Sequence, residues 1–167
     1  FLSAVTIAAA TPASRPNIIF IFADDWGWGD LSSHGHPWLK TPHLDRLARE
    51  GTDFHQFNVL NPVCSPSRTA AMTGMFPSRF GIHQHFAAPA QNLARNMPDW
   101  LDARAPTVAR FFQQAGYRTA HFGKWHLTNR ETHGAPAPSA YGFDEFAIFN
   151  GGAEMPSAGL HATPTTP

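Results

Sequence analysis

The stretch TVARFFQQAGYRTAHFGKWH, residues 107–126, decides the fold class of this chain. Its first part, residues 107–115, predicts a helix with Pro106 at its start and Gly116 as its stop, because proline suits the first turn and glycine follows the last. A strand follows and ends at Gly123. A helix that leads directly into a strand is the repeating step of layered α/β folds.

Three further segments extend this pattern. Residues 17–22 (NIIFIF) are too short to cross a membrane and predict a strand buried on both faces. Residues 41–51 predict a short helix, because Pro42 suits its first position and Gly51 its end. Residues 52–59 predict another strand. This order predicts an α/β fold with a layered, mostly parallel sheet flanked by helices.

The two ends of the chain and one internal stretch lack such periodicity. Residues 1–14 predict either the tail of a secretory signal peptide, which implies export, or a disordered alanine-rich terminus. Residues 84–104 predict a loop or insertion, and residues 153–167, rich in Gly, Pro and Thr, predict an irregular tail. We therefore expect one domain over residues 15–152.

The composition excludes some classes of partner. Twelve basic and twelve acidic side chains give a formal net charge of zero, so the chain lacks the charge signature of proteins that bind nucleic acid or anionic membranes. No segment is suited to span a bilayer. Among ten histidines, the pairs His34/His36 and His83/His85 could line a pocket, but we expect them in exposed loops.

The only cysteine of the chain, Cys64, lies in the run CSPSR at residues 64–68. Alone, it can be a buried small hydrophobe, a reactive thiol, or a residue that is chemically converted. If a helix begins here, Pro66 suits its first turn and Arg68 lies one turn beyond the cysteine. Backbone N–H groups and a guanidinium would then favour negative charge, which predicts an anion pocket.

Charged side chains also follow the two main strands. Asp24 and Asp25 end the apolar run, and ligands of open α/β sheets gather at the carboxyl ends of strands, so this pair suits Ca²⁺ or Mg²⁺. Alternatively, the pair caps a turn. Lys124 and His126 follow the later strand, where Gly123 permits close approach of a ligand. From the residues alone, this Lys-x-His could equally be surface solvation.

These motifs together resemble the sulfatase family, the formylglycine-dependent, arylsulfatase-like members of the alkaline-phosphatase-like superfamily. The first match is Cys-x-Pro-Ser-Arg at residues 64–68, followed by a Thr-Gly pair. The second match, Gly-Tyr-x-Thr with Gly-Lys-Trp-His, lies at residues 116–126. The resemblance extends over residues 17–152, and it departs at Thr128, where the family commonly has glycine.

The resemblance implies a covalent mechanism. A formylglycine-generating or anaerobic sulfatase-maturating enzyme would oxidise Cys64 to formylglycine, and one hydroxyl of the hydrated aldehyde would attack the sulfur of a sulfate ester. The second hydroxyl would lose its proton and expel sulfate, so that one displacement becomes two easier steps. Arg68 and Lys124 would contact the sulfate, and His126 would position the oxygens of the nucleophile.

The resemblance also implies a metal site and a longer protein. Asp24, Asp25 and the converted Cys64 would hold Ca²⁺ or Mg²⁺. Because the family completes this site with a later Asp followed by Asn or His, we expect the chain to be the N-terminal part of an enzyme and inactive alone. The substrate would be a small-molecule or glycan sulfate ester. Two alternatives stay open: a phosphonate or phosphate ester hydrolase, and a non-catalytic protein that binds sulfated glycans and keeps the thiol.

Overall fold

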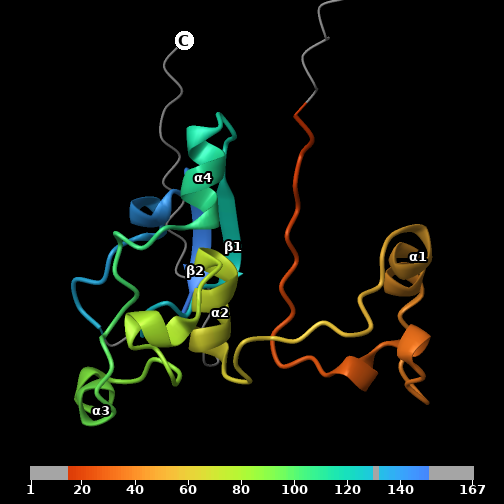
Figure 1. Cartoon of the computed structure of the whole chain (residues 1–167), viewed down its shortest axis with the longest axis horizontal. Helices are drawn as coiled ribbons and strands as arrows, with labels where there is room; N and C mark the ends of the chain where they lie inside the picture. The colour runs from red at the N-terminus through yellow and green to blue at the C-terminus, as the bar shows by residue number, and fades with distance from the viewer. Residues whose placement is uncertain (1–14, 130–131, 151–167) are drawn as a thin grey trace, which may run out of the picture.

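Two parallel strands form the sheet in the computed structural model, which describes residues 15–129 and 132–150 (Figure 1). Strand β1 (Ala120–Lys124) pairs with β2 (Glu145–Phe149), with Ala120 opposite Glu145 and Lys124 opposite Phe149. Parallel neighbours require a crossover, and the intervening segment provides it with the short helix η4 (Pro138–Tyr141). The predicted α/β class is confirmed.

Two helices accompany this sheet. Helix α4 (Val108–Gln114) precedes β1, and the side chain of its N-cap residue, Thr107, accepts a hydrogen bond from the backbone N–H of Arg110 at 3.3 Å. Helix α2 (Cys64–Thr73) contacts α4. Both helices lie where the sequence predicts them, because proline and glycine mark their ends locally.

The hydrophobic core lies between these helices and the crossover. Its buried residues are Ile82, Phe86, Met97, Leu101, Ala105, Ala109, Trp125, Leu127, Tyr141 and Phe143. Three of them come from residues 84–104, which also contain helix α3 (Pro89–Ala94). This stretch, which the sequence predicts as a loop or insertion, therefore helps to build the core.

Helix α4 and η4 approach each other closely at Gly142. Its φ of 96° favours glycine, and a Cβ at this position would lie 2.7 Å from backbone atoms of Arg110. The guanidinium of Arg110 donates to the carbonyls of Ala103, Ala105 and Ala140 at 2.7–2.8 Å. This arrangement fixes the chain immediately before β2 against α4.

Residues 17–22 are extended but pair with no strand among the described residues. Ile19, Phe20 and Ile21 are 73–85% exposed, so the prediction of a strand buried on both faces is wrong for this part of the chain. The segment lies close to the chain around β1 at both of its ends. Nη1 of Arg15 would lie 2.6 Å from a Cβ at Gly116, and Asp24 contacts the end of β1. It therefore runs beside β1 in the same direction (Figure 1).

Residues 28–59 lie apart from the sheet (Figure 1). They contain η1 (Trp28–Asp30), η2 (Ser32–His34) and α1 (Pro42–Glu50). The helix predicted at residues 41–51 is confirmed, although none of its residues is buried. The strand predicted at residues 52–59 is wrong: this stretch has a turn at residues 55–56, and its aromatic side chains are exposed.

His34 differs from the exposed loop histidine that we expected. Its side chain is 6% exposed, with Nε2 3.0 Å from Oδ2 of Asp53 and Nδ1 2.8 Å from the carbonyl of Trp28. Its ring stacks on Trp28 with centroids 3.9 Å apart. The hydrogen bond with Asp53 raises the pKa of His34. This contact joins η2 to the segment after α1.

The predicted leader at residues 1–14 and the predicted tail at residues 153–167 lie outside the described residues. Within the described ranges, every helix is too short or too polar to cross a membrane. Short helix η3 (Pro77–Phe80) completes the elements.

Candidate active site

The start of α2 positions Cys64 and Arg68. Val63 is the N-cap residue, Cys64 is the first helical residue, and Arg68 follows one turn later. The helix ends at Gly74. Cys64 is a free, half-buried cysteine, whereas the side chain of Arg68 is only 8% exposed. The backbone N–H groups of the first turn and the helix dipole add positive potential around the cysteine.

Asp24 joins the two cations that the sequence predicts. Its Oδ1 accepts a hydrogen bond from Nη2 of Arg68 at 3.0 Å, and its Oδ2 accepts one from Nζ of Lys124. Partial burial raises the pKa of the Asp24 carboxyl, but the hydrogen bonds and charges of Lys124 and Arg68 outweigh this effect, and the pKa is lowered. Three residues from distant parts of the sequence therefore meet at one point.

Arg68 connects three segments through its guanidinium. Besides Asp24, it donates from Nη1 to the carbonyl of Lys124 at 2.6 Å, and its Cζ lies 5.4 Å from the centroid of the Phe22 ring. Its Nε is buried without a hydrogen-bond partner among the described residues. A buried donor without a partner is costly, so this N–H is available for an anion such as a sulfate oxygen.

His126 lies two residues beyond Lys124, is 8% exposed and has a φ of 49°. Its Nε2 lies 3.3 Å from the carbonyl of Phe86, which can only accept, so Nε2 carries the proton. Its Nδ1 is buried and has no partner among the described residues. Burial, with smaller effects from Lys124 and Arg68, lowers the pKa of His126 to about 4. The neutral ring therefore presents a free acceptor at pH 7.

Two contacts of this site lie outside the sequence prediction. The backbone N–H of Phe86 donates to Oγ of Ser65 at 3.0 Å, and Nε2 of His121 lies 3.2 Å from the carbonyl of Lys124. Burial lowers the pKa of His121. No signal for the Phe86 contacts exists in the sequence, since they use backbone groups.

Gly123 has a φ of 104°, which favours glycine, and no atom lies within 4 Å of the place its Cβ would occupy. The space beside Gly123 is therefore open, and the sequence-based expectation that a ligand approaches here stays a prediction.

The carboxylates Asp24 and Asp25 partly fit a hard cation. Their oxygens are the donors that Ca²⁺ and Mg²⁺ prefer. However, both oxygens of Asp24 contact cationic side chains, and exposed Asp25, with a φ of 52°, makes no hydrogen bond or ion pair with a described residue. Across residues 15–129 and 132–150, no three His, Cys, Asp or Glu side chains form a metal site. Bound Ca²⁺ would therefore take only part of its ligands from this pair.

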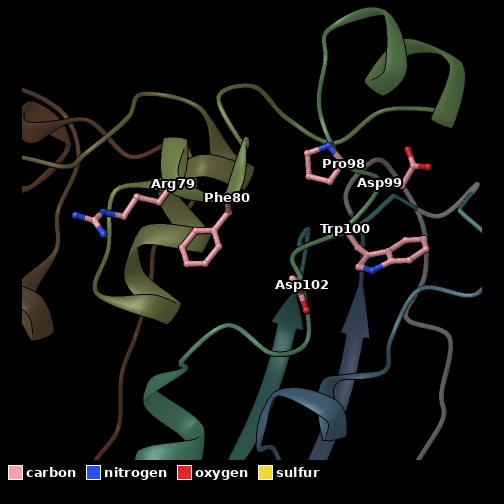
Figure 2. Close-up of a pocket in the computed structure, with 6 residues that line it drawn as sticks. All are labelled: Arg79, Phe80, Pro98, Asp99, Trp100 and Asp102. Carbon is pink, nitrogen blue, oxygen red and sulfur yellow. The ribbon is translucent and has the colours of Figure 1, made fainter.

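A separate hollow of about 590 Å³ is lined by Arg79, Phe80, Pro98, Asp99, Trp100 and Asp102. Figure 2 shows Phe80 and Trp100 on opposite sides of it, while Arg79 and Asp99 point away from the space between them. None of the predicted site residues lines this hollow. It lacks converging polar groups, so we assign the chemistry to the centre around Arg68 instead.

Lys124 at the end of β1, Arg68 of α2 and the carboxylate of Asp24 meet and define an anion-binding centre on an α/β scaffold. The sequence model of the sulfatase family matches residues 16–164. This match covers most of the chain, and the chain belongs to the sulfatase family. The resemblance at residues 64–68 and 116–126 is thereby confirmed.

Several known proteins are similar to this chain. N-acetylgalactosamine-6-sulfatase of the dog, Canis lupus familiaris, is 40% identical over 151 residues, which cover 87% of this chain and 27% of that protein. The crystal structure of Ps i-CgsB has a TM-score of 0.68 and 35% identity, over 83% of this chain and 29% of that one.

A third relative carries a bound substrate. The structure of BT4656 in complex with its substrate, D-glucosamine-2-N,6-O-disulfate, has a TM-score of 0.64 and 32% identity, over 83% of this chain and 24% of that one. The chain thus spans between 24% and 29% of the length of these three proteins.

Proposed function

We propose that the protein containing this chain hydrolyses sulfate monoesters through a formylglycine derived from Cys64. The observation that carries the proposal is the meeting of Arg68, Lys124 and Asp24 beside the helix that begins with Cys64. A surface Lys-x-His or a turn-capping Asp pair would not require this convergence. Membership of the sulfatase family supports the same activity.

Each side chain has a role in this mechanism. Arg68 and Lys124 hold the sulfate and stabilise the negative charge that develops on its oxygens in the transition state. Neutral His126 accepts a hydrogen bond at Nδ1 and so orients, or receives a proton from, a hydroxyl of the nucleophile. Asp24 keeps both cations in place through its two carboxylate oxygens.

The proposed mechanism also requires a formylglycine at position 64 and a divalent cation. One hydroxyl of hydrated formylglycine would attack sulfur and displace the alcohol of the ester, and deprotonation of the second hydroxyl would then expel sulfate as the aldehyde re-forms. A divalent cation, Ca²⁺ or Mg²⁺, held in part by Asp24 and Asp25, would neutralise charge on the sulfate and the nucleophile. Cys64 fits the conversion because it is a free thiol at a partly exposed helix start.

We propose a sulfated sugar as the substrate. Support comes from the name of the dog relative and from the disulfated glucosamine bound to BT4656. A formylglycine-generating or anaerobic sulfatase-maturating enzyme would act as the maturation partner. An exported location is part of the same proposal, since the apolar leader predicted at residues 1–14 would direct it.

The test uses the full-length protein purified from its native host, where conversion of Cys64 can occur. Mass spectrometry of the tryptic peptide of residues 50–68 should show an aldehyde at position 64. The protein should hydrolyse p-nitrophenyl sulfate much faster than phenyl phosphonate esters, and Cys64→Ala should abolish turnover. Preference for the phosphonate would favour the related phosphonate hydrolases. An unmodified thiol together with sugar-sulfate binding and no turnover would favour a binding protein.

A further inference from the structure

The backbone of Phe86 is fixed from two sides of the candidate site. Its N–H donates to Oγ of Ser65, the residue after Cys64, at 3.0 Å, and its carbonyl lies 3.3 Å from Nε2 of His126. Phe86 itself is 2% exposed and belongs to the core. The segment around it is thus tied to both the nucleophile's helix and the catalytic histidine.

The residues on either side of Phe86 are held in the same way. Nη1 of Arg95 donates to the carbonyl of His85 at 3.2 Å. Buried Asn92 accepts from the N–H of Ala87 and donates to its carbonyl, both at 2.9 Å. Such support is what holds a functional side chain in one geometry, because few backbone movements remain open to it.

The side chain of His85 is the group that this support positions. Its ring is half-buried and lies 6.5 Å, between centroids, from the ring of His126. Its Nδ1 lies 2.9 Å from Oε1 of Gln84, which can only accept, so Nδ1 carries a proton. Its Nε2 makes no hydrogen bond with any described residue. In the neutral ring this atom is a free acceptor.

We infer that His85 is a specificity residue that accepts a hydrogen bond from a hydroxyl group in the organic part of the sulfate ester. This rests on the proposed function. The sulfate itself is assigned to Arg68 and Lys124, and no described contact joins His85 to either. Because the ring of His85 neighbours that of His126 and makes no described contact with the two cations, we assign it to the alcohol side of the ester. A sugar ring carries such hydroxyls, whereas an aryl ester does not.

The test compares two esters on the full-length protein, N-acetylgalactosamine 6-sulfate and p-nitrophenyl sulfate. His85→Ala should lower the ratio of kcat/KM for the sugar ester to that for the aryl ester about fivefold, as expected for one lost hydrogen bond. The loss should lie mainly in KM. His85→Gln, which keeps an acceptor, should restore part of it. His83→Ala is the matched control, because His83 lies two residues earlier and is exposed.

A binding measurement separates this inference from the proposed function. N-acetylgalactosamine 6-sulfate is titrated by calorimetry into Cys64→Ala protein, with and without His85→Ala, and the second substitution should weaken Kd about fivefold. If the unsubstituted protein turns over neither ester, the proposed function is wrong, and calorimetry alone decides the role of His85. Equal Kd values, no binding of the sugar sulfate, or equal losses for both esters would overturn the role.

Discussion

Two Arg–Asp pairs of this chain have similar chemistry but different burial. Arg68 and Asp24 are 3.0 Å apart, with side chains 8% and 34% exposed, whereas Arg104 and Asp102 are 2.6 Å apart, with side chains 90% and 49% exposed. Double-mutant cycles on the free energy of unfolding should therefore give a larger coupling energy for the first pair than for the second. The variants are Arg68→Met with Asp24→Asn, and Arg104→Met with Asp102→Asn.

The magnitude for Arg68 follows from its contacts. Arg68→Met removes the hydrogen bonds to Asp24 and to the carbonyl of Lys124, and it leaves that carbonyl with one donor fewer. We expect a loss of about 2–3 kcal/mol in the free energy of unfolding, since charge-assisted hydrogen bonds in partly buried sites are worth about that much. The coupling with Asp24 should be about 1–2 kcal/mol, reduced because Asp24 is one-third exposed and keeps Lys124.

The assay is urea unfolding followed by circular dichroism at low and high salt. The coupling between Arg104 and Asp102 should lie near the error of the measurement and vanish in salt, because solvent screens both groups. The coupling between Arg68 and Asp24 should persist. Equal coupling energies for the two pairs, or a salt-sensitive coupling between Arg68 and Asp24, would refute the reasoning that burial strengthens the interaction of Arg68 with Asp24.

Three further outcomes are expected. Burial lowers the pKa of His126 to about 4, below its unfolded value of 6.5. Between pH 6.5 and pH 4 the unfolded state therefore binds a proton that the folded state does not. The free energy of unfolding should fall by about 2–3 kcal/mol as the pH is lowered over this range. Unfolding of His126→Gln at each pH should show a correspondingly shallower slope. EDTA should lower turnover of p-nitrophenyl sulfate and Ca²⁺ should restore it, with Asp25→Asn needing more Ca²⁺; metal-independent turnover would contradict the cation. Gly142→Ala should lower the thermal unfolding midpoint by several degrees, because its Cβ would lie 2.7 Å from backbone atoms of Arg110, whereas an unchanged midpoint would mean that the contact relaxes freely.

The helices were predictable because their signals are local. Proline at the start and glycine after the end mark α1, and the same kind of punctuation marks α4 and α2. Strand β1 followed from the same reasoning, since Gly116 ends the preceding helical pattern. In each case a few neighbouring residues decide the conformation.

Other parts depend on distant partners and could not be predicted in this way. The apolar run at residues 17–22 has the composition of a buried strand, but composition does not state which strand it pairs with, and it stays exposed among the described residues. Residues 84–104 show no period, yet Phe86, Met97 and Leu101 enter the core through tertiary packing alone. Their burial follows from the meeting of segments that sequence spacing does not encode.

In the candidate site, too, some residues are indicated by local motifs and others only by contacts between distant segments. Motif order indicates Arg68 and Lys124, and these residues do meet, directly at the carbonyl of Lys124 and through the carboxylate of Asp24. The contacts of Phe86 could not be read from any motif, because its backbone N–H and carbonyl are present in every residue. The sequence predicts an exposed loop position for His85, but its ring is half-buried beside His126.

The uncovered segment at residues 17–22 has a consequence for the handling of this chain. Its six residues, NIIFIF, carry no charge and no proline, and branched and aromatic side chains dominate them, which is the composition of segments that stack into cross-β fibrils. Ile19 and Ile21 are at least 80% exposed, so each copy of the chain presents an unpaired apolar segment with which another copy can pair. We therefore expect this chain to self-associate increasingly as its concentration rises. The substitution Ile19→Lys should suppress this association, because it places a charge in the apolar segment.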